Sequence, residues 1–254
     1  MKMNKIKFLI ILFLAIAPIS CILLDVIMNT IYGIQLKQGL EPQKVGFIQT
    51  VCEQTIYFSV WSALVTSSWG FIKLINYIKT DKKIVWVESK NTETMVLTYS
   101  FVSMIIFTGA MFIARDTVVG FTNWYNTIKS VVEHWICPFI IMIYYFYFRE
   151  QRPDLSLRNY MINHAWKNNI LELFYGAYLI IRVIYIKKYM DYNASLRPFP
   201  YEQMDPYKTS FFQMYGLMLA AIFATYLFSG LFEYLSFKNS LIVNKRALKN
   251  FEKN

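Results

Sequence analysis

Six apolar stretches, each close to 20 residues long, constrain the fold of this 254-residue chain more than any other feature. They lie at about residues 8–28, 55–78, 95–114, 130–148, 170–187 and 211–235. A helix rises 1.5 Å per residue, so about 20 apolar residues cross the ~30 Å hydrocarbon core of a membrane. Backbone polar groups in lipid must be satisfied within the protein. The sequence therefore predicts an all-α integral membrane protein with six transmembrane helices in a single bundle.

The composition favours a membrane protein over a soluble one. Hydrophobic residues make up 56% of the chain and charged residues only 17%, whereas a soluble domain carries about 25% charged residues. The net charge of +10 comes from lysines and arginines between the apolar stretches, with no basic stripe of the kind that binds nucleic acid. We therefore expect membrane lipid as the partner and no nucleic acid. The three cysteines form no CxxC pair and no metal-ligand spacing, and we predict no metal or organic cofactor.

The distribution of positive charge predicts the orientation of the helices. The N-terminus, the segments 79–94 and 149–169, and the C-terminal tail together hold twice as many lysines and arginines as the alternate segments. Short cytoplasmic segments carry the excess of positive charge in membrane proteins. We therefore predict a multi-pass protein of the cell membrane with both termini in the cytoplasm.

The first apolar stretch admits two interpretations. "MKMNKIKFLIILFLAIAPISC" has the basic start, apolar centre and small residue before Cys21 that are typical of a cleaved signal peptide. However, the sequence stays apolar beyond Cys21, and Pro18 stands where a lipoprotein signal favours a branched apolar residue. The length of the apolar run favours a retained transmembrane helix.

Five polar residues from five different stretches are predicted to lie at a similar depth, near the outer surface. They are Asp25, Ser59, Arg115, His134 and Arg182. Ionisable groups in a membrane are costly and usually face a cavity or a polar partner, so these residues are candidates for a binding or catalytic site. Two structural explanations compete with a site: polar residues are tolerated at the ends of spans, and Asp25 and Arg182 can form an ion pair within the bundle.

Hydroxyl side chains recur along the second stretch. Thr55, Ser59, Ser62 and Thr66 have the spacing that places them on one helix face. Such residues commonly line contacts between membrane helices. One of them acts as a nucleophile only where a base such as His134 lies within hydrogen-bond reach.

Four segments, in order along the chain, resemble a known family. They are "IYFSVWSALV" (56–65), "ARDTVVGFTNWY" (114–125), "VVEHWICPFIIMIYYFYF" (131–148) and "LRPFPYEQMDPYKTS" (196–210). They are similar to segments of the androgen-induced six-span membrane proteins, which include the androgen-dependent TFPI-regulating protein of animals, and above all to their bacterial branch. The chain departs from that branch at Ala63, where the branch usually has Asn, and across 197–201, where the first part of the loop motif is altered.

The resemblance implies an enzyme. The animal members of the family hydrolyse lipid esters, notably fatty acid esters of hydroxy fatty acids, with a threonine nucleophile and a partner histidine. The family threonine falls on Ser59 and the family histidine on His134, which implies a serine–histidine pair. Arg182, Arg115 and Asp25, together with Asp205 in the loop motif, are the candidate substrate-binding residues.

Three functions therefore remain open from the sequence. The first is an intramembrane lipid carboxylic-ester hydrolase, with Ser59 as nucleophile and His134 as base. The second is a non-catalytic lipid-binding or assembly protein, because fold does not dictate function and the altered positions suit lost chemistry. The third is a small transporter, which is disfavoured because no inverted repeat and no broken helix is apparent in the sequence.

Overall fold

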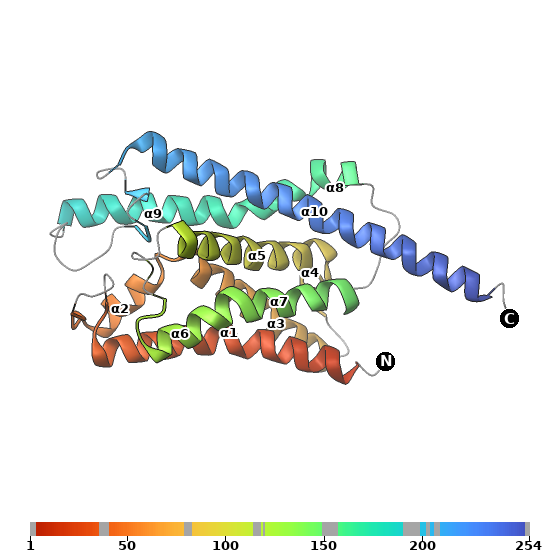
Figure 1. The fold of residues 1–254 in the computed structure, drawn as a ribbon, viewed down its shortest axis with the longest axis horizontal. Helices are drawn as coiled ribbons and strands as arrows, with labels where there is room; N and C mark the ends of the chain where they lie inside the picture. The colour runs from red at the N-terminus through yellow and green to blue at the C-terminus, as the bar shows by residue number, and fades with distance from the viewer. Residues whose placement is uncertain are drawn as a thin grey trace.

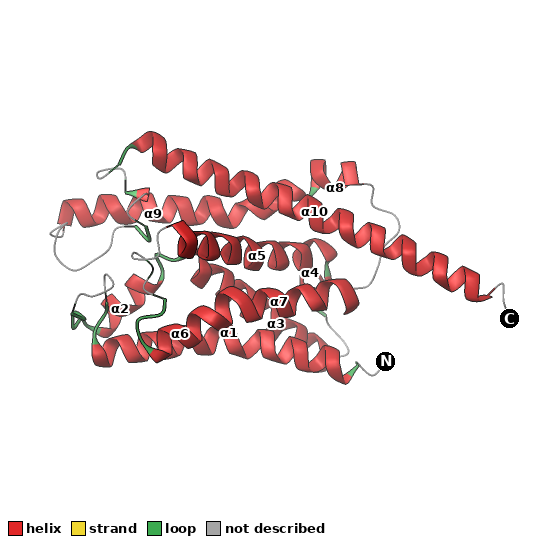
Figure 2. Ribbon diagram, viewed as in Figure 1, coloured by secondary structure: helices red, strands yellow, loops and turns green. Residues whose placement is uncertain are grey.

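The computed structural model describes residues 4–35, 41–78, 83–113, 118, 120–148, 157–189, 199–201, 204–205 and 209–251. Across these residues the chain is helical apart from its loops and turns and one isolated bridge between Ile34 and Gln43 (Figure 2). The helices are α1 (Lys5–Tyr32), α2 (Phe47–Gln54), α3 (Phe58–Ile78), α4 (Val85–Glu88), α5 (Lys90–Ile113), α6 (Trp124–Val131), α7 (Cys137–Ile143), α8 (Leu157–Asn163), α9 (Ile170–Tyr189) and α10 (Phe211–Phe251). π-Helical segments at Val132–Ile136 and Tyr144–Phe148 flank α7, and a 3-10 segment, Ala165–Asn169, leads into α9.

Six of the helical stretches are long and apolar enough to cross a membrane. They are Lys5–Tyr32, Phe58–Ile78, Lys90–Ile113, Trp124–Phe148, Ala165–Tyr189 and Phe211–Asn239. The predicted six-helix membrane fold is confirmed, and each stretch overlaps the one expected from the sequence. The second stretch begins later than expected, because residues 55–57 form a turn between α2 and α3.

The six helices run side by side, and both ends of the chain lie at the same end of the bundle (Figure 1). We call this the terminus end, and the opposite end, where α2 lies, the far end. The last helix, α10, continues past the terminus end as a single projecting helix. An even number of spans accounts for the shared position of the two termini.

The helix α1 packs closely against α3. A Cβ added at Gly70 of α3 would lie 2.8 Å from the backbone nitrogen of Ala15, so only glycine permits this approach. Pro18 lies within α1, where proline lacks an N–H group and disturbs the helical hydrogen bonds. The N–H of Ile19 donates to Ser67 Oγ of α3 at 3.2 Å. A side chain of the neighbouring helix thus satisfies backbone that the proline disturbs, as membrane helices require.

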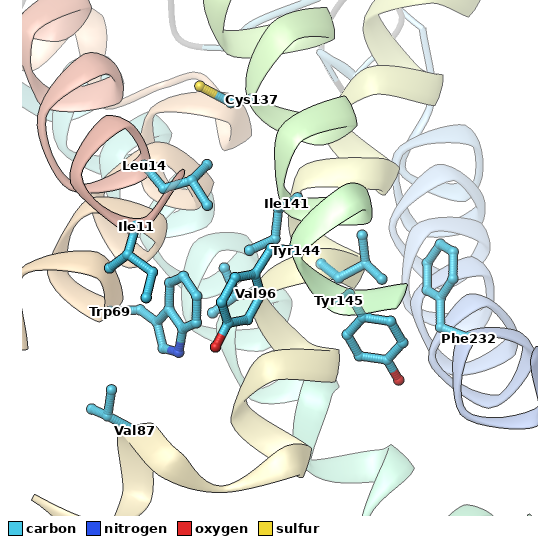
Figure 3. Packing of buried hydrophobic residues seen from close by; sticks show 11 residues of the cluster. Ile11, Leu14, Trp69, Val87, Val96, Cys137, Ile141, Tyr144, Tyr145 and Phe232 are labelled. Atoms are coloured by element: carbon cyan, nitrogen blue, oxygen red, sulfur yellow. The ribbon is translucent and has the colours of Figure 1, made fainter. Parts of the chain in front are cut away.

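Large apolar side chains fill the half of the bundle near the terminus end. Figure 3 shows Trp69, Tyr144, Tyr145 and Phe232 among the branched aliphatic residues of α1, α5 and α7. The rings of Trp69 and Tyr144 meet edge to face with centroids 5.1 Å apart, a favoured arrangement for aromatic pairs. This half of the bundle is a packed core, and the open space lies toward the far end.

Candidate functional site

A cavity of about 550 Å³ lies inside the bundle toward the far end. Its wall includes residues of α1, α3, α5, α6, α9 and α10, together with Pro200, Tyr201 and Met204 of the loop before α10. Most of the wall is apolar, from Val102 and Phe107 of α5 to Leu217 and Phe228 of α10. Ser59, Ser103, His134 and Glu172 supply polar groups. A mostly apolar cavity with a few polar groups is typical of a small-molecule site.

A local change of helix type places His134 on this wall. Pro138 follows His134 by four residues, so its ring displaces the His134 carbonyl from regular α-helical bonding. The segment Val132–Ile136 is accordingly π-helical, a form that is frequent at functional sites. The His134 ring lies flat against Phe107, with centroids 3.8 Å apart, and its Nδ1 is 3.3 Å from Ser103 Oγ. The structure therefore pairs the histidine with a serine that the sequence did not single out.

Ser59 lines the same cavity, as the second residue of α3. It is half-buried, and its side chain makes no hydrogen bond to any residue that the structure describes. Ser59 and His134 thus line the same cavity, but the hydroxyl that contacts the His134 ring belongs to Ser103. The first turn of a helix has N–H groups without intrahelical acceptors, so α3 also brings partial positive charge to the wall beside Ser59.

The expected row of four hydroxyls along one helix face is not continuous. Thr55 lies in the turn before α3, where its Oγ1 donates to the Cys52 carbonyl at 2.8 Å and contacts the Tyr178 hydroxyl. Thr66 donates to the Ser62 carbonyl at 2.9 Å and lies 3.3 Å from Ser100 Oγ of α5. These contacts show that Thr66 serves helix packing, the ordinary role of such residues in membranes.

Asp25 lines the cavity within a network of polar side chains from α1, α2 and α6. Lys129 Nζ lies 2.7 Å from Asp25 Oδ2 and donates to Gln54 Oε1 at 2.5 Å. Asn29 Nδ2 donates to Asp25 Oδ1 at 2.8 Å, and the Tyr125 hydroxyl donates to Asn29 Oδ1 at 3.2 Å. Asp25 is therefore neutralised by Lys129, a residue that the sequence analysis did not connect with it.

Arg182 forms an ion pair with Glu53, and not with Asp25 as the sequence suggested. Its NH2 lies 2.8 Å from Glu53 Oε1, and its NH1 donates to the Cys52 carbonyl at 3.0 Å. The suggested Asp25–Arg182 pair is wrong, because α2 supplies Glu53 to Arg182 while α6 supplies Lys129 to Asp25. Arg182 does not line the cavity among the described residues, so a role in holding substrate stays a prediction.

Asp205, the remaining candidate that the structure describes, lies in the loop before α10. Asp205 is buried, and its backbone carbonyl accepts hydrogen bonds from the N–H and the Oγ1 of Thr209, both at 2.9 Å. Its neighbour Met204 lines the cavity. Arg115 lies outside the described residues. The roles predicted for Asp205 and Arg115 in substrate binding stay predictions.

Several polar residues of the cavity were not predicted from the sequence, among them Ser103 and Glu172. Ser103 interrupts the apolar run of the third span, and this interruption was the available signal. Glu172 belongs to the first turn of α9, where Thr225 Oγ1 of α10 donates to its Oε1 at 2.7 Å. Its Oε2 is buried without a partner among the described residues. The cavity therefore has a second, acidic polar group on the α9 side of its wall.

A separate polar cluster near the terminus end was also missed. Lys73 Nζ lies 2.5 Å from Glu93 Oε1, 3.1 Å from Glu88 Oε2 and 3.0 Å from the Tyr144 hydroxyl. Burial disfavours the charged form of Glu88, but the hydrogen bond from Asn76 and the charge of Lys73 outweigh it and lower the Glu88 pKa. Two carboxylates and a hydroxyl surround the buried amine of Lys73 and compensate its charge, which gives Lys73 a structural role deep in a span.

No family model, curated protein or solved structure matches the chain. The fold and the cavity therefore define its class directly, as a multi-pass helical membrane protein with a cavity in the far-end part of its bundle. Among the described residues there is no group of three His, Cys, Asp or Glu side chains arranged to hold a metal ion. The chemistry available on the cavity wall is that of hydroxyls, an imidazole, carboxyl groups such as those of Asp25 and Glu172, and the amine of Lys129.

Proposed function

We propose that the chain binds an acyl lipid in the cavity and hydrolyses its carboxylic ester. The observation that carries this proposal is the contact of 3.3 Å between Ser103 Oγ and His134 Nδ1 on the wall of an apolar cavity. A hydroxyl within hydrogen-bond reach of an imidazole is the arrangement that activates a serine nucleophile. The apolar wall suits an acyl chain and disfavours a highly polar substrate.

The proposed reaction proceeds by acyl transfer. His134 accepts the proton of the serine hydroxyl as the oxygen attacks the ester carbonyl, and the imidazole then gives that proton to the departing alcohol. A water molecule, activated by the same imidazole, cleaves the acyl-serine and releases the carboxylic acid. Partial positive charge at the start of α3 stabilises the negative charge that develops on the carbonyl oxygen.

Two serines compete for the role of nucleophile. Ser103 is favoured by its contact with His134. Ser59 is favoured by the resemblance to the family threonine, by its place on the same wall and by a hydroxyl that no described residue engages. The two candidates make different predictions for single variants, so one experiment separates them.

The experiment measures hydrolysis of a long-chain lipid ester by purified variants in vesicles. We expect His134→Ala and the nucleophile→Ala variant each to abolish activity, and their combination to be little worse, because members of a nucleophile–base unit are grossly non-additive. If Ser59 is the nucleophile, Ser59→Thr retains activity. Ser100→Ala is the matched control, because Ser100 lies on the same helix as Ser103 and does not line the cavity. Full activity of His134→Ala would refute the proposed chemistry.

A non-catalytic lipid-binding protein is the second candidate. It is favoured because no carboxylate among the described residues forms a hydrogen bond to the His134 ring that would hold the ring in place for catalysis. Asp25 is engaged by Lys129 and Asn29, and Glu133 makes no hydrogen bond to a described residue. A fluorophosphonate probe distinguishes the two functions. Labelling of Ser59 or Ser103 favours the hydrolase, whereas lipid that copurifies without labelling or turnover favours the binding protein.

We also propose that the chain lies in the cell membrane with both termini in the cytoplasm. The excess of lysine and arginine in the N-terminus, the C-terminal tail and the segments 79–94 and 149–169 supports this orientation. The cavity would then lie in the outer half of the membrane, where water for the second step is near.

A further inference from the structure

The edge of the cavity lies along the line between α5 and α10. Ile105 and Ile106 of α5 line the cavity and are 40% and 37% exposed, and Leu217 of α10 lines it and is 43% exposed. Side chains that both line the cavity and lie on the outer surface mark the place where the two meet. Both helices are membrane spans, so the surface outside this edge faces lipid.

The two helices touch nearer the terminus end and part toward the far end. The Phe101 ring of α5 meets the Phe228 and Phe232 rings of α10, each with centroids 5.1 Å apart. Farther toward the terminus end, the Tyr145 hydroxyl and Thr94 Oγ1 both donate to Glu233 Oε2. In Figure 1 the ribbons of α5 and α10 lie farther apart toward the far end than near the terminus end. Ile105 follows Phe101 by one turn, about 6 Å along the helix axis, so the gap opens directly beyond the aromatic contact.

Small residues border this gap. Gly216, Ala220 and Ala224 recur every four residues on one face of α10, and both alanines line the cavity. A face of small residues usually allows another helix to approach closely. At Gly216, however, an added Cβ would meet no atom within 4 Å, and the same holds at Gly109 of α5. Neither position is covered by a neighbouring element that the structure describes, and each is next in sequence to a residue that lines the cavity, Ala110 or Leu217.

We propose that a lipid of the surrounding bilayer enters the cavity sideways through this gap, with its acyl chain between α5 and α10. The gap, here the α5–α10 portal, is bordered by Ile105, Ile106, Ala110, Leu217 and Ala220. Ile106 follows Ser103 by three residues, about 4.5 Å along the axis. The portal thus lies close to the depth of the Ser103–His134 contact, and an ester near the head of the lipid reaches the site without leaving the membrane. The substrate class is a long-chain acyl ester resident in the bilayer, an assignment that rests on the proposed function.

Blocking the portal tests this route. Ala220→Trp places a large ring in the gap, and Ala177→Trp is the matched control, because Ala177 is exposed on α9 and does not line the cavity. We expect Ala220→Trp to lower hydrolysis of a long-chain ester in vesicles by about ten-fold or more, and to lower that of a short, water-soluble p-nitrophenyl ester by a smaller factor, because only the long chain must pass the gap. Ala177→Trp should change neither rate. An unchanged vesicle rate in Ala220→Trp would overturn the proposal.

A second measurement is independent of catalysis. The protein is reconstituted with a phospholipid that carries a diazirine on its acyl chain, irradiated, and mapped by mass spectrometry. We expect adducts on α5 and α10 at the portal that disappear in Ala220→Trp, while adducts on the lipid-facing residues Leu173 and Phe174 of α9 persist in both. Adducts on α9 without any at the portal would overturn the proposal. Portal adducts in a protein that cleaves no ester would support lipid entry through the portal and refute the proposed hydrolysis. The experiment therefore distinguishes a failure of the portal proposal from a failure of the proposed function.

Discussion

Two buried glutamates in the membrane spans, Glu93 and Glu133, have opposite surroundings. Glu93 Oε1 lies 2.5 Å from Lys73 Nζ and accepts from the Tyr144 hydroxyl at 2.9 Å. Both carboxyl oxygens of Glu133 are buried without a hydrogen-bond partner among the described residues. An ionised carboxylate without a partner is far more costly in such a place than a neutral carboxyl group. We infer that Glu93 is charged and that Glu133 carries its proton.

This difference predicts opposite effects of the same substitution. Glu133→Gln replaces a neutral carboxyl group with a neutral amide and should leave the melting temperature in detergent unchanged or raised. Glu93→Gln removes a carboxylate bound by Lys73 and Tyr144 while Lys73 keeps Glu88, so we expect a loss of about 1.5–3 kcal/mol, the range for a hydrogen bond to a charged group. Thermal unfolding followed by fluorescence of both variants provides the test. A larger fall for Glu133→Gln than for Glu93→Gln would contradict the assigned charges.

At the level of residues, the sequence indicates which side chains are candidates for a site but not their partners. Counting along the spans places Asp25, Ser59, Arg115, His134 and Arg182 at a similar level. Asp25, Ser59 and His134 line one cavity, Arg182 does not, and Arg115 lies outside the described residues. Their partners depend on which helices are neighbours and how each is rotated, and apolar length carries no such information. For this reason Lys129 was not connected with Asp25, nor Ser103 with His134, before the helices were seen together.

At the level of elements, the start of α3 was mispredicted because the apolar run continues through the turn at residues 55–57. Side chains break the helix there by binding its backbone. Trp61 Nε1 donates to the Thr55 carbonyl at 2.8 Å, and the Tyr175 hydroxyl donates to the Ile56 carbonyl at 2.5 Å. Tyr175 comes from α9, more than 100 residues away in sequence, so no local pattern reveals this contact. The break matters because it makes Ser59 the second residue of α3.

The contact between α1 and α3 gives a prediction with an internal control. Gly70→Ala puts a Cβ within 3 Å of the Ala15 backbone, so the two helices must separate and the protein should lose stability. Gly109→Ala puts the same methyl group into open space. It should be neutral or stabilising by up to about 1 kcal/mol, because alanine favours a helix more than glycine does.

Melting temperatures of these two variants, measured side by side in one detergent, decide the matter. The intrinsic preference for helix is the same at both sites, so the difference between them isolates the cost of pushing α1 from α3. Equal melting temperatures would mean that the backbones of α1 and α3 are not in contact at Gly70.

At the level of the whole molecule, the number of spans followed from apolar length alone, because lipid leaves a backbone few alternatives to a helix. The path of α10 did not follow from it. The apolar pattern predicts that this span ends at 235, yet the helix continues to Phe251 beyond the bundle. The cavity likewise did not follow from it, because residues of α1, α3, α5, α6, α9 and α10 together form its wall.

The orientation of the molecule is testable with a native cysteine. Cys52 is exposed in α2 at the far end, whereas Cys21 and Cys137 are buried. With cytoplasmic termini, a membrane-impermeant maleimide should label Cys52 in intact cells, and Cys52→Ser should remove the label. A cysteine introduced by Ile162→Cys in that background lies in α8 at the terminus end, at a position that is 60% exposed. It should react only after the cells are permeabilised.

The opposite pattern, with Ile162→Cys labelled in intact cells and Cys52 protected, would reverse the bundle in the membrane. Because the cavity and the α5–α10 portal lie in the half of the bundle nearer Cys52, the labelling also decides which leaflet supplies the lipid. Labelling of Cys52 from outside assigns the portal to the outer leaflet. In that orientation an ester added to the external face of intact cells is cleaved without crossing the membrane, and the reverse orientation requires the lipid to reach the inner leaflet first.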